Sequence, residues 1–177
     1  MQRDELAAKI AESSVLRGNF TLRSGRTSTW YIDKYRFTTR PDVLRGIAEL
    51  ATSMLPEGTT RLAGAELGGV PLAAAVAMAA DKPCLYVRNQ KKDYGTAQRF
   101  EGVLEEGDKV VLLEDIATSG GQAIEAARDL EASGAQVVQI LVTVDRMQGA
   151  RKAVEAAGFR FDSMFTVRDL GIDPDED

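Results

Sequence analysis

Two adjacent carboxylates, Glu114 and Asp115, follow four consecutive apolar residues in the stretch 109–121. Such an uninterrupted apolar run is typical of a strand that is buried on both faces, in a parallel sheet with helices on either side. Neighbouring carboxylates at the end of a strand can accept hydrogen bonds from hydroxyl groups, or hold Mg2+ directly or through water. We therefore expect the chemistry of this protein at the carboxyl end of that strand.

A turn of small residues comes directly after the carboxylates. Residues 117–121 supply two hydroxyls and two glycines, and residues 122–130 are expected to form a helix. A glycine-containing turn at a helix start points backbone N–H groups at one spot, beside the positive end of the helix dipole, and this suits a phosphate. A ribose 5-phosphate needs both features: carboxylates that accept hydrogen bonds from its sugar hydroxyls, and a turn that binds its phosphate. An ordinary buried strand that ends in acids and a turn is the alternative interpretation.

Other catalytic and nucleotide-binding motifs are missing from the sequence. A Walker B strand also ends in acids, but no Gly-Lys pair occurs, so there is no Walker A loop. The dinucleotide fingerprint Gly-x-Gly-x-x-Gly does not occur either. The absence of histidine excludes Ser-His and Cys-His catalysis, and the single cysteine, Cys84, excludes an intramolecular disulfide. Proton transfer would fall to carboxylates, lysine or tyrosine.

The length and the pattern of elements predict how these residues are positioned. A chain of 177 residues without a linker or repeat fits one domain over 1–177. Strand and helix alternate, which predicts an α/β fold with a doubly wound, mostly parallel sheet flanked by helices, preceded by a small antiparallel hairpin. The expected strands are 19–22, 29–33, 61–65, 83–88, 109–113, 136–144 and 159–165. The expected helices are 4–13, one that starts within 39–42 and continues through 43–54, 72–80, 122–130 and 150–157.

The distribution of charge indicates an anionic ligand. The net charge is −5, yet residues 17–45 hold seven basic side chains against two acidic ones, and residues 88–99 hold four against one. Two basic segments on an acidic chain favour a concentrated anion over an extended nucleic-acid track. Residues 89–98 are polar and without periodicity, which is typical of a lid or binding loop. No apolar run is long enough to span a membrane and the first residues are polar, so we expect a cytoplasmic protein.

Five segments, in the same order, resemble the orotate phosphoribosyltransferases, a family of type I phosphoribosyltransferases. The single-domain archaeal and bacterial forms are similar in length. The resemblance implies a hood contributed mainly by residues 1–40, and a Mg2+-dependent homodimer that transfers the phosphoribosyl group of 5-phosphoribosyl-1-pyrophosphate (PRPP) to orotate. The products would be orotidine 5′-monophosphate and pyrophosphate, in pyrimidine biosynthesis. The segments are 22–28, 64–73, 88–95, 109–121 and 144–146.

The resemblance also implies roles for individual residues. The acids would hold the ribose hydroxyls, the turn would cradle the 5-phosphate, and two glycines would approach the pyrophosphate. Mg2+ would be held mainly through PRPP, with at most a water bridge to Asp115. The residues implied for PRPP are Gly68, Gly69, Arg88, Lys92, Tyr94, Glu114, Asp115, Ile116, Ala117, Thr118, Ser119, Gly120, Gly121 and Gln122. Those implied for orotate are Thr118, Arg146, Arg23, Trp30 and Tyr31, and those implied for catalysis are Lys92, Arg88 and Asp115. The loop 89–98 would reach into the site of the neighbouring subunit.

Three positions depart from the usual pattern of that family. Asn89 stands where a lysine is usual, Tyr94 where a histidine is usual, and Arg23 where many members have a lysine. Asn89 removes a positive charge, and Tyr94 can donate a hydrogen bond but carries no charge at neutral pH. Two alternatives therefore stay open: a phosphoribosyltransferase for another purine or pyrimidine base, and a PRPP-sensing homologue without catalysis. Neither a nucleic acid nor a membrane is expected as a partner.

Overall fold

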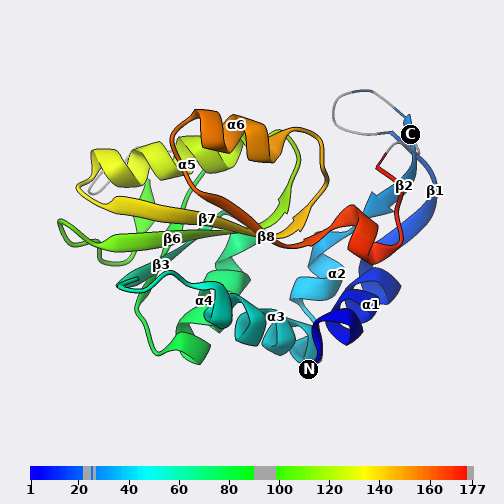
Figure 1. Ribbon diagram of the computed structural model, residues 1–177, viewed down its shortest axis with the longest axis horizontal. Coiled ribbons are helices and arrows are strands. Elements are labelled where there is room, and N and C mark those ends of the chain that lie inside the picture. Colours follow the sequence, from blue (N-terminus) through cyan, green and yellow to red (C-terminus); the bar gives the residue numbers. More distant parts are fainter. Residues whose placement is uncertain (22–24, 26, 90–98, 175–177) are drawn as a thin grey trace.

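A six-stranded sheet forms the centre of the molecule (Figure 1). The computed structural model describes residues 1–21, 25, 27–89 and 99–174. The strand order is β5-β4-β3-β6-β7-β8, and all neighbouring pairs are parallel except β4 with β5. The strands are β3 (Arg61–Ala65), β4 (Cys84–Val87), β5 (Phe100–Glu101), β6 (Lys109–Ala117), β7 (Gln136–Asp145) and β8 (Phe161–Thr166).

Helices cover both faces of this sheet, as the sequence predicts. Helices α3 (Pro41–Met54) and α4 (Gly69–Ala80) lie below it in Figure 1, and α5 (Gly121–Ala132) and α6 (Ala150–Ala156) lie above it. Val111 and Leu113 of β6 belong to the apolar cluster on the α3 and α4 side, whereas Val110 and Leu112 belong to the cluster on the α5 and α6 side. Successive side chains of a strand point to opposite faces, so burial of both faces explains the uninterrupted apolar run.

The N-terminal hood packs against the end of the chain. It consists of α1 (Arg3–Ser14), the antiparallel pair β1 (Val15–Thr21) and β2 (Thr27–Ile32), and the short helix α2 (Lys34–Thr38). Leu6 and Trp30 share one apolar cluster with Phe165 of β8. Arg3 fixes the hood further, because its Nη1 lies 3.0 Å from Asp169 in the 3-10 helix η1 (Val167–Leu170). The hood and the lower face of the sheet therefore share one core.

The structure differs from the sequence prediction at several elements. Helix α2 and strand β5 were not predicted, because five and two residues are too few to show a periodicity. Strand β6 does not end at the carboxylates but continues to Ala117, since β7 pairs with it as far as Asp145. Helix α4 begins at Gly69, three residues before the predicted start. Within the described part of the chain, no helix combines the length and apolarity needed to cross a membrane.

Candidate active site

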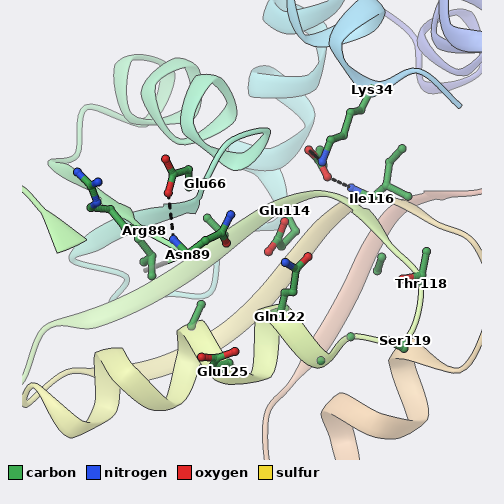
Figure 2. A pocket seen from close by; sticks show the side chains of 18 of the residues that line it. Lys34, Glu66, Arg88, Asn89, Glu114, Ile116, Thr118, Ser119, Gln122 and Glu125 are labelled. Carbon is green, nitrogen blue, oxygen red and sulfur yellow. Dashed lines mark hydrogen bonds and ion pairs between the residues drawn. The ribbon is translucent and has the colours of Figure 1, made fainter. Parts of the chain in front are cut away.

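A cavity of about 160 Å³ opens at the carboxyl end of β6 (Figure 2). Its wall comes from the ends of β3, β4 and β6, from the turn after β6, from α5, and from one residue of the hood, Lys34. This is the edge where ligands bind in open parallel sheets, because loops from neighbouring strands converge there. The residues lining it are Lys34, Ala65, Glu66, Val87, Arg88, Asn89, Arg99, Glu114, Asp115, Ile116, Ala117, Thr118, Ser119, Gly120, Gly121, Gln122, Ala123, Glu125 and Ala126.

The turn between β6 and α5 has the features of an anion cradle. Gly120, the residue before the helix, has a φ of 80° and no side chain that could accept a hydrogen bond from the first N–H groups of α5. A Cβ atom there would lie 3.0 Å from Cγ2 of Val154, so α6 also restricts the position to glycine. The N–H groups at the start of α5 are thus left for a ligand, at the positive end of the helix dipole.

The two carboxylates of β6 have different surroundings. The Asp115 side chain is 3% exposed, and its Oδ2 lies 2.9 Å from Nζ of Lys34. Its Oδ1 accepts a hydrogen bond from the backbone N–H of Ile116 at 2.6 Å. Gly68 packs directly on this carboxylate, so that a Cβ atom at Gly68 would overlap it. The predicted pyrophosphate loop and the predicted ribose-binding acid are therefore in contact.

Glu114 points into the cavity beside Gln122, on the other side of the strand (Figure 2). Burial, together with repulsion from Asp115, raises the pKa of Glu114 to about 8, although Lys34 opposes this shift. Burial alone would lower the pKa of Lys34, but the ion pair with Asp115 raises it above the ordinary 10.5. At neutral pH the ligand-free site therefore holds a charged Lys34 close to a mostly protonated Glu114, which can donate a hydrogen bond.

The opposite end of the cavity is formed by the residues that flank 90–98. Nη1 of Arg88 lies 3.2 Å from Oε1 of Glu101, and the backbone N–H of Asn89 donates to Glu66 at 3.0 Å. Arg99 makes ion pairs of 2.6 Å with two α5 carboxylates, Glu125 and Asp129. The predicted site residues Lys92 and Tyr94, like Arg23 of the hood, lie outside the described residues.

The residues predicted for the base are only partly brought together. Thr118 lines the cavity, and the backbone N–H of Arg146 donates to Ala117 of the same turn at 2.9 Å. The Arg146 guanidinium lies 4.3 Å above the ring of Trp30, which is fully buried. Tyr31 is 41% exposed. Because neighbours on a strand point to opposite faces, Tyr31 faces away from this pair. Its ring packs instead on Phe20, at 5.7 Å between centroids.

The cavity wall also contains residues that were not singled out in the sequence, among them Lys34, Glu66 and Arg99. Lys34 and Arg99 fall inside the two basic segments that indicated an anionic ligand, but a charge count does not say which member reaches the site. Asp33 caps α2, since its side chain accepts a hydrogen bond from the Tyr35 N–H at 3.2 Å. An Asp before a short polar stretch is a helix-start signal that would have drawn attention to Lys34.

Comparisons with known proteins identify the family. Residues 34–164 match the family model described as the phosphoribosyl transferase domain. The chain is 41% identical to an orotate phosphoribosyltransferase of Pyrococcus furiosus over 95% of its own length and 94% of the relative. It is 44% identical to that of Halobacterium salinarum, over 94% and 95% of the two chains.

The solved structures agree with this. A crystal structure of Mycobacterium tuberculosis orotate phosphoribosyltransferase in complex with PRPP has a TM-score of 0.83 and 32% identity, over 96% of this chain and 99% of the other. Its agreement in fold covers the hood as well as the sheet, since nearly the whole chain is matched. The cavity, the turn and these relatives together place the chain in the phosphoribosyltransferase domain family, and within it the protein belongs to the orotate phosphoribosyltransferases.

Proposed function

We propose that this protein transfers the 5-phosphoribosyl group from PRPP to orotate, which gives orotidine 5′-monophosphate and pyrophosphate for pyrimidine biosynthesis. One observation carries the proposal: a single cavity gathers the acids Glu114 and Asp115 with the whole turn from Ile116 to Gln122. The similarity to orotate phosphoribosyltransferases over nearly the whole chain supports orotate as the base.

PRPP fits this edge of the sheet in one orientation. The 5-phosphate would lie on the turn, where the N–H groups at the start of α5 and the hydroxyls of Thr118 and Ser119 can donate to it. The ribose hydroxyls would then lie over Glu114 and Asp115, which come just before the turn near the end of β6. The pyrophosphate would extend towards Gly68 and Gly69 on one side and towards Arg88 on the other, where the positive charge of Arg88 would be close to the leaving group.

The proposed mechanism is mainly electrostatic. Breaking the bond between C1 of the ribose and the pyrophosphate leaves positive charge on the ribose and negative charge on the leaving group, while a ring nitrogen of orotate forms the new bond to C1. Arg88 and Lys92 would stabilise the departing pyrophosphate, as preorganised cations do for charge that develops in a transition state. The negative charge of orotate lies on its carboxylate, so the ring nitrogen that bonds to C1 must also lose its proton. That proton would pass to the departing pyrophosphate or to water, since the chain contains no histidine to take it.

The acids fit a Mg2+ ion that is carried by PRPP rather than by the protein. Mg2+ prefers oxygen ligands, keeps several waters and often binds through substrate phosphates with few carboxylates. Among the residues that the structure describes, no group of three or more His, Cys, Asp or Glu side chains is placed to hold a metal. Asp115 would then contact the ion at most through water, because its side chain is only 3% exposed and its carboxylate already pairs with Lys34. When bound, the ion supplies counter-charge to the pyrophosphate.

For orotate, we propose Thr118 and Arg146 as the contacts that best agree with the geometry. Both adjoin the turn, and the guanidinium of Arg146 is oriented by the ring of Trp30. Trp30 would act from behind Arg146 rather than on the base, since its side chain is fully buried. Contacts from Arg23 and Tyr31 remain predictions.

The homodimer also remains a proposal, together with a cytoplasmic location and a single domain over residues 1–177. Exposed apolar residues support a subunit contact on the side of α4 and β4: Met78 is 85% exposed and borders a groove with Pro83, Cys84 and Tyr86. Strand β4 leads within two residues into the segment 89–98, which in the proposed dimer would reach the neighbouring site. Sedimentation of the purified protein would test the dimer, and a monomer at assay concentration would contradict it.

The function is tested by following the loss of orotate absorbance with PRPP and Mg2+, beside a panel of other pyrimidine and purine bases. Turnover of orotate alone is the expected result. Turnover of another base would contradict orotate as the substrate but would leave the proposed PRPP site unchanged. Binding of PRPP without turnover of any base would replace the transferase by a sensing protein.

A further inference from the structure

A lysine of the hood makes the contact that joins the hood to the PRPP half of the site. Lys34 is the first residue of α2, and Figure 2 shows its side chain reaching from that helix to the end of β6. Its Nζ lies 2.9 Å from Oδ2 of Asp115. The Lys34 side chain is 35% exposed and lines the cavity, whereas the Asp115 side chain is 3% exposed. The lysine therefore reaches both the ligand space and the buried carboxylate.

The Asp115 carboxylate depends on this contact for its orientation. One oxygen is held by the N–H of Ile116, and the other has only Lys34 as a polar partner among the described residues. Gly68 packs on the same oxygen. A buried carboxylate without its cation is costly, so loss of the lysine would be met by rotation of the side chain or by uptake of a proton. Either change would alter what Asp115 presents to a ribose hydroxyl.

We propose that Lys34 is a positioning residue for PRPP, which holds the Asp115 carboxylate in the orientation that receives a ribose hydroxyl. The inference rests on the proposed function, because it takes Asp115 to be a ribose ligand. It also makes the hood, which the resemblance connects with the base, a contributor to the binding of the sugar. The alternative role for this lysine is to anchor α2 on the sheet, and the experiment separates the two roles.

The chain offers a matched control for that experiment. Lys9 of α1 is 33% exposed and pairs with Asp42 of α3 at 3.3 Å, so it too joins the hood to the main body. The Asp42 carboxylate, however, is 41% exposed and borders no part of the cavity wall. Lys9→Met and Lys34→Met thus remove similar ion pairs, of which only one reaches the site. Lys34→Arg keeps the positive charge, so it tests whether a cation at this position restores ribose 5-phosphate binding.

The measurement is binding of ribose 5-phosphate by calorimetry without Mg2+, followed by KM and kcat for both substrates. Lys34→Met is expected to weaken ribose 5-phosphate binding about tenfold or more and to raise KM for PRPP similarly. KM for orotate and kcat should change by less than about threefold, since the lost contact is made equally in the ground state and the transition state. Lys34→Arg should recover most of the affinity, and Lys9→Met should match the wild type.

A double-mutant cycle tests whether Lys34 acts through Asp115. In the background of Asp115→Asn, the change Lys34→Met should weaken ribose 5-phosphate binding no further. Unchanged affinity in Lys34→Met, an equal loss for orotate and PRPP, or a full additional loss in the double variant would each overturn the inference. Failure of the wild-type protein to bind ribose 5-phosphate would instead contradict the proposed function. The two failures are therefore distinguishable.

Discussion

Two ion pairs, each with a buried carboxylate, lie at the opposite ends of β6, and they differ in how many hydrogen bonds the carboxylate accepts. At the amino end, Asp108 accepts hydrogen bonds from Arg61 Nε at 2.5 Å, from the Thr60 hydroxyl at 2.8 Å and from the Glu105 N–H at 2.9 Å. At the carboxyl end, Asp115 has one backbone N–H and Lys34. The first pair is enclosed, with both side chains less than 10% exposed, whereas the second adjoins the cavity.

This difference separates an ion pair that supports the fold from one that supports a site. Burial alone would raise the pKa of Asp108, but hydrogen bonds from Glu105 N–H, Arg61 and Thr60 hold it below the ordinary 3.8. Three protein donors thus fill most of the acceptor positions of this enclosed carboxylate. At Asp115 the partner is a flexible lysine that also faces the ligand space, so a sugar hydroxyl can join the contact. The two ends therefore differ in the number of hydrogen-bond partners of the carboxylate and in access to the cavity.

The largest expected effect is on the rate of catalysis at the candidate active site. Lys92→Ala should lower kcat by about 10²–10³, because one cation that stabilises the departing pyrophosphate is lost. The melting temperature should not change. Steady-state kinetics with saturating substrates would measure this, with the exposed Lys152→Ala of α6 as the control. An unchanged kcat would remove Lys92 from the mechanism.

The next effect concerns the partly satisfied carboxylate. Asp115→Asn should lower kcat/KM for PRPP by about 10–100-fold, since a hydrogen bond to a charged acceptor is lost at the ribose. The free energy of unfolding should change little, because the amide can still accept from the Ile116 N–H. Kinetics and urea unfolding on the same preparation would check both. A large loss of stability with normal kinetics would erase the distinction between the two ends of β6.

The matched substitution at the enclosed pair, Asp108→Asn, should lower stability and leave the kinetics unchanged. Asp108→Asn is expected to lower the free energy of unfolding by about 3 kcal/mol, because it leaves the guanidinium of Arg61 buried without a counter-charge. Values of kcat/KM per folded molecule should stay those of the wild type. Because the pKa of Asp108 is lowered on folding, its contribution is present above the pKa of the unfolded chain and is lost as the pH falls through the folded value. Urea unfolding should therefore show the two proteins converging in strong acid.

The smallest effect concerns Glu114 in the ligand-free protein. Its pKa is raised on folding to about 8 from an ordinary 4.5, so between these values the folded state holds a proton that the unfolded chain has released. Stability should then fall as the pH rises through this window, and Glu114→Gln should remove that fall. Melting temperatures of both proteins between about pH 5 and about pH 8 would test this. Parallel curves would show that Glu114 titrates normally.

The parts of the site that lie in one segment were predictable from the sequence, and the parts assembled by the fold were not. Residues 114–122 occupy a strand end, a turn and a helix start, so local rules place them together. Lys34 reaches Asp115 only because α2 lies over the end of β6, and no local pattern contains that information. Trp30 and Tyr31 are neighbours in sequence, yet the alternation of β2 places them on opposite faces.

In the fold, too, features with a local sequence pattern were predictable and features set by distant contacts were not. The order of strands and helices and the covering of both sheet faces were predicted correctly, because long elements carry a periodicity that reports their burial. The short elements α2 and β5 were missed, although α2 carries a cavity residue. The length of β6 was also predicted wrongly, since its last residues are held by pairing with β7 rather than by their own hydrophobicity.

The burial of Trp30 has a practical consequence for spectroscopy. It is the only tryptophan in the chain, it is fully buried, and it carries the Arg146 guanidinium on its ring. Its fluorescence therefore reports on one place alone, the junction of the hood with the end of β7. Emission at short wavelength marks a docked hood, a shift to longer wavelength marks its release into water, and a change of intensity without a shift marks movement of Arg146. The molecule thus contains its own optical probe of the hood, without any label.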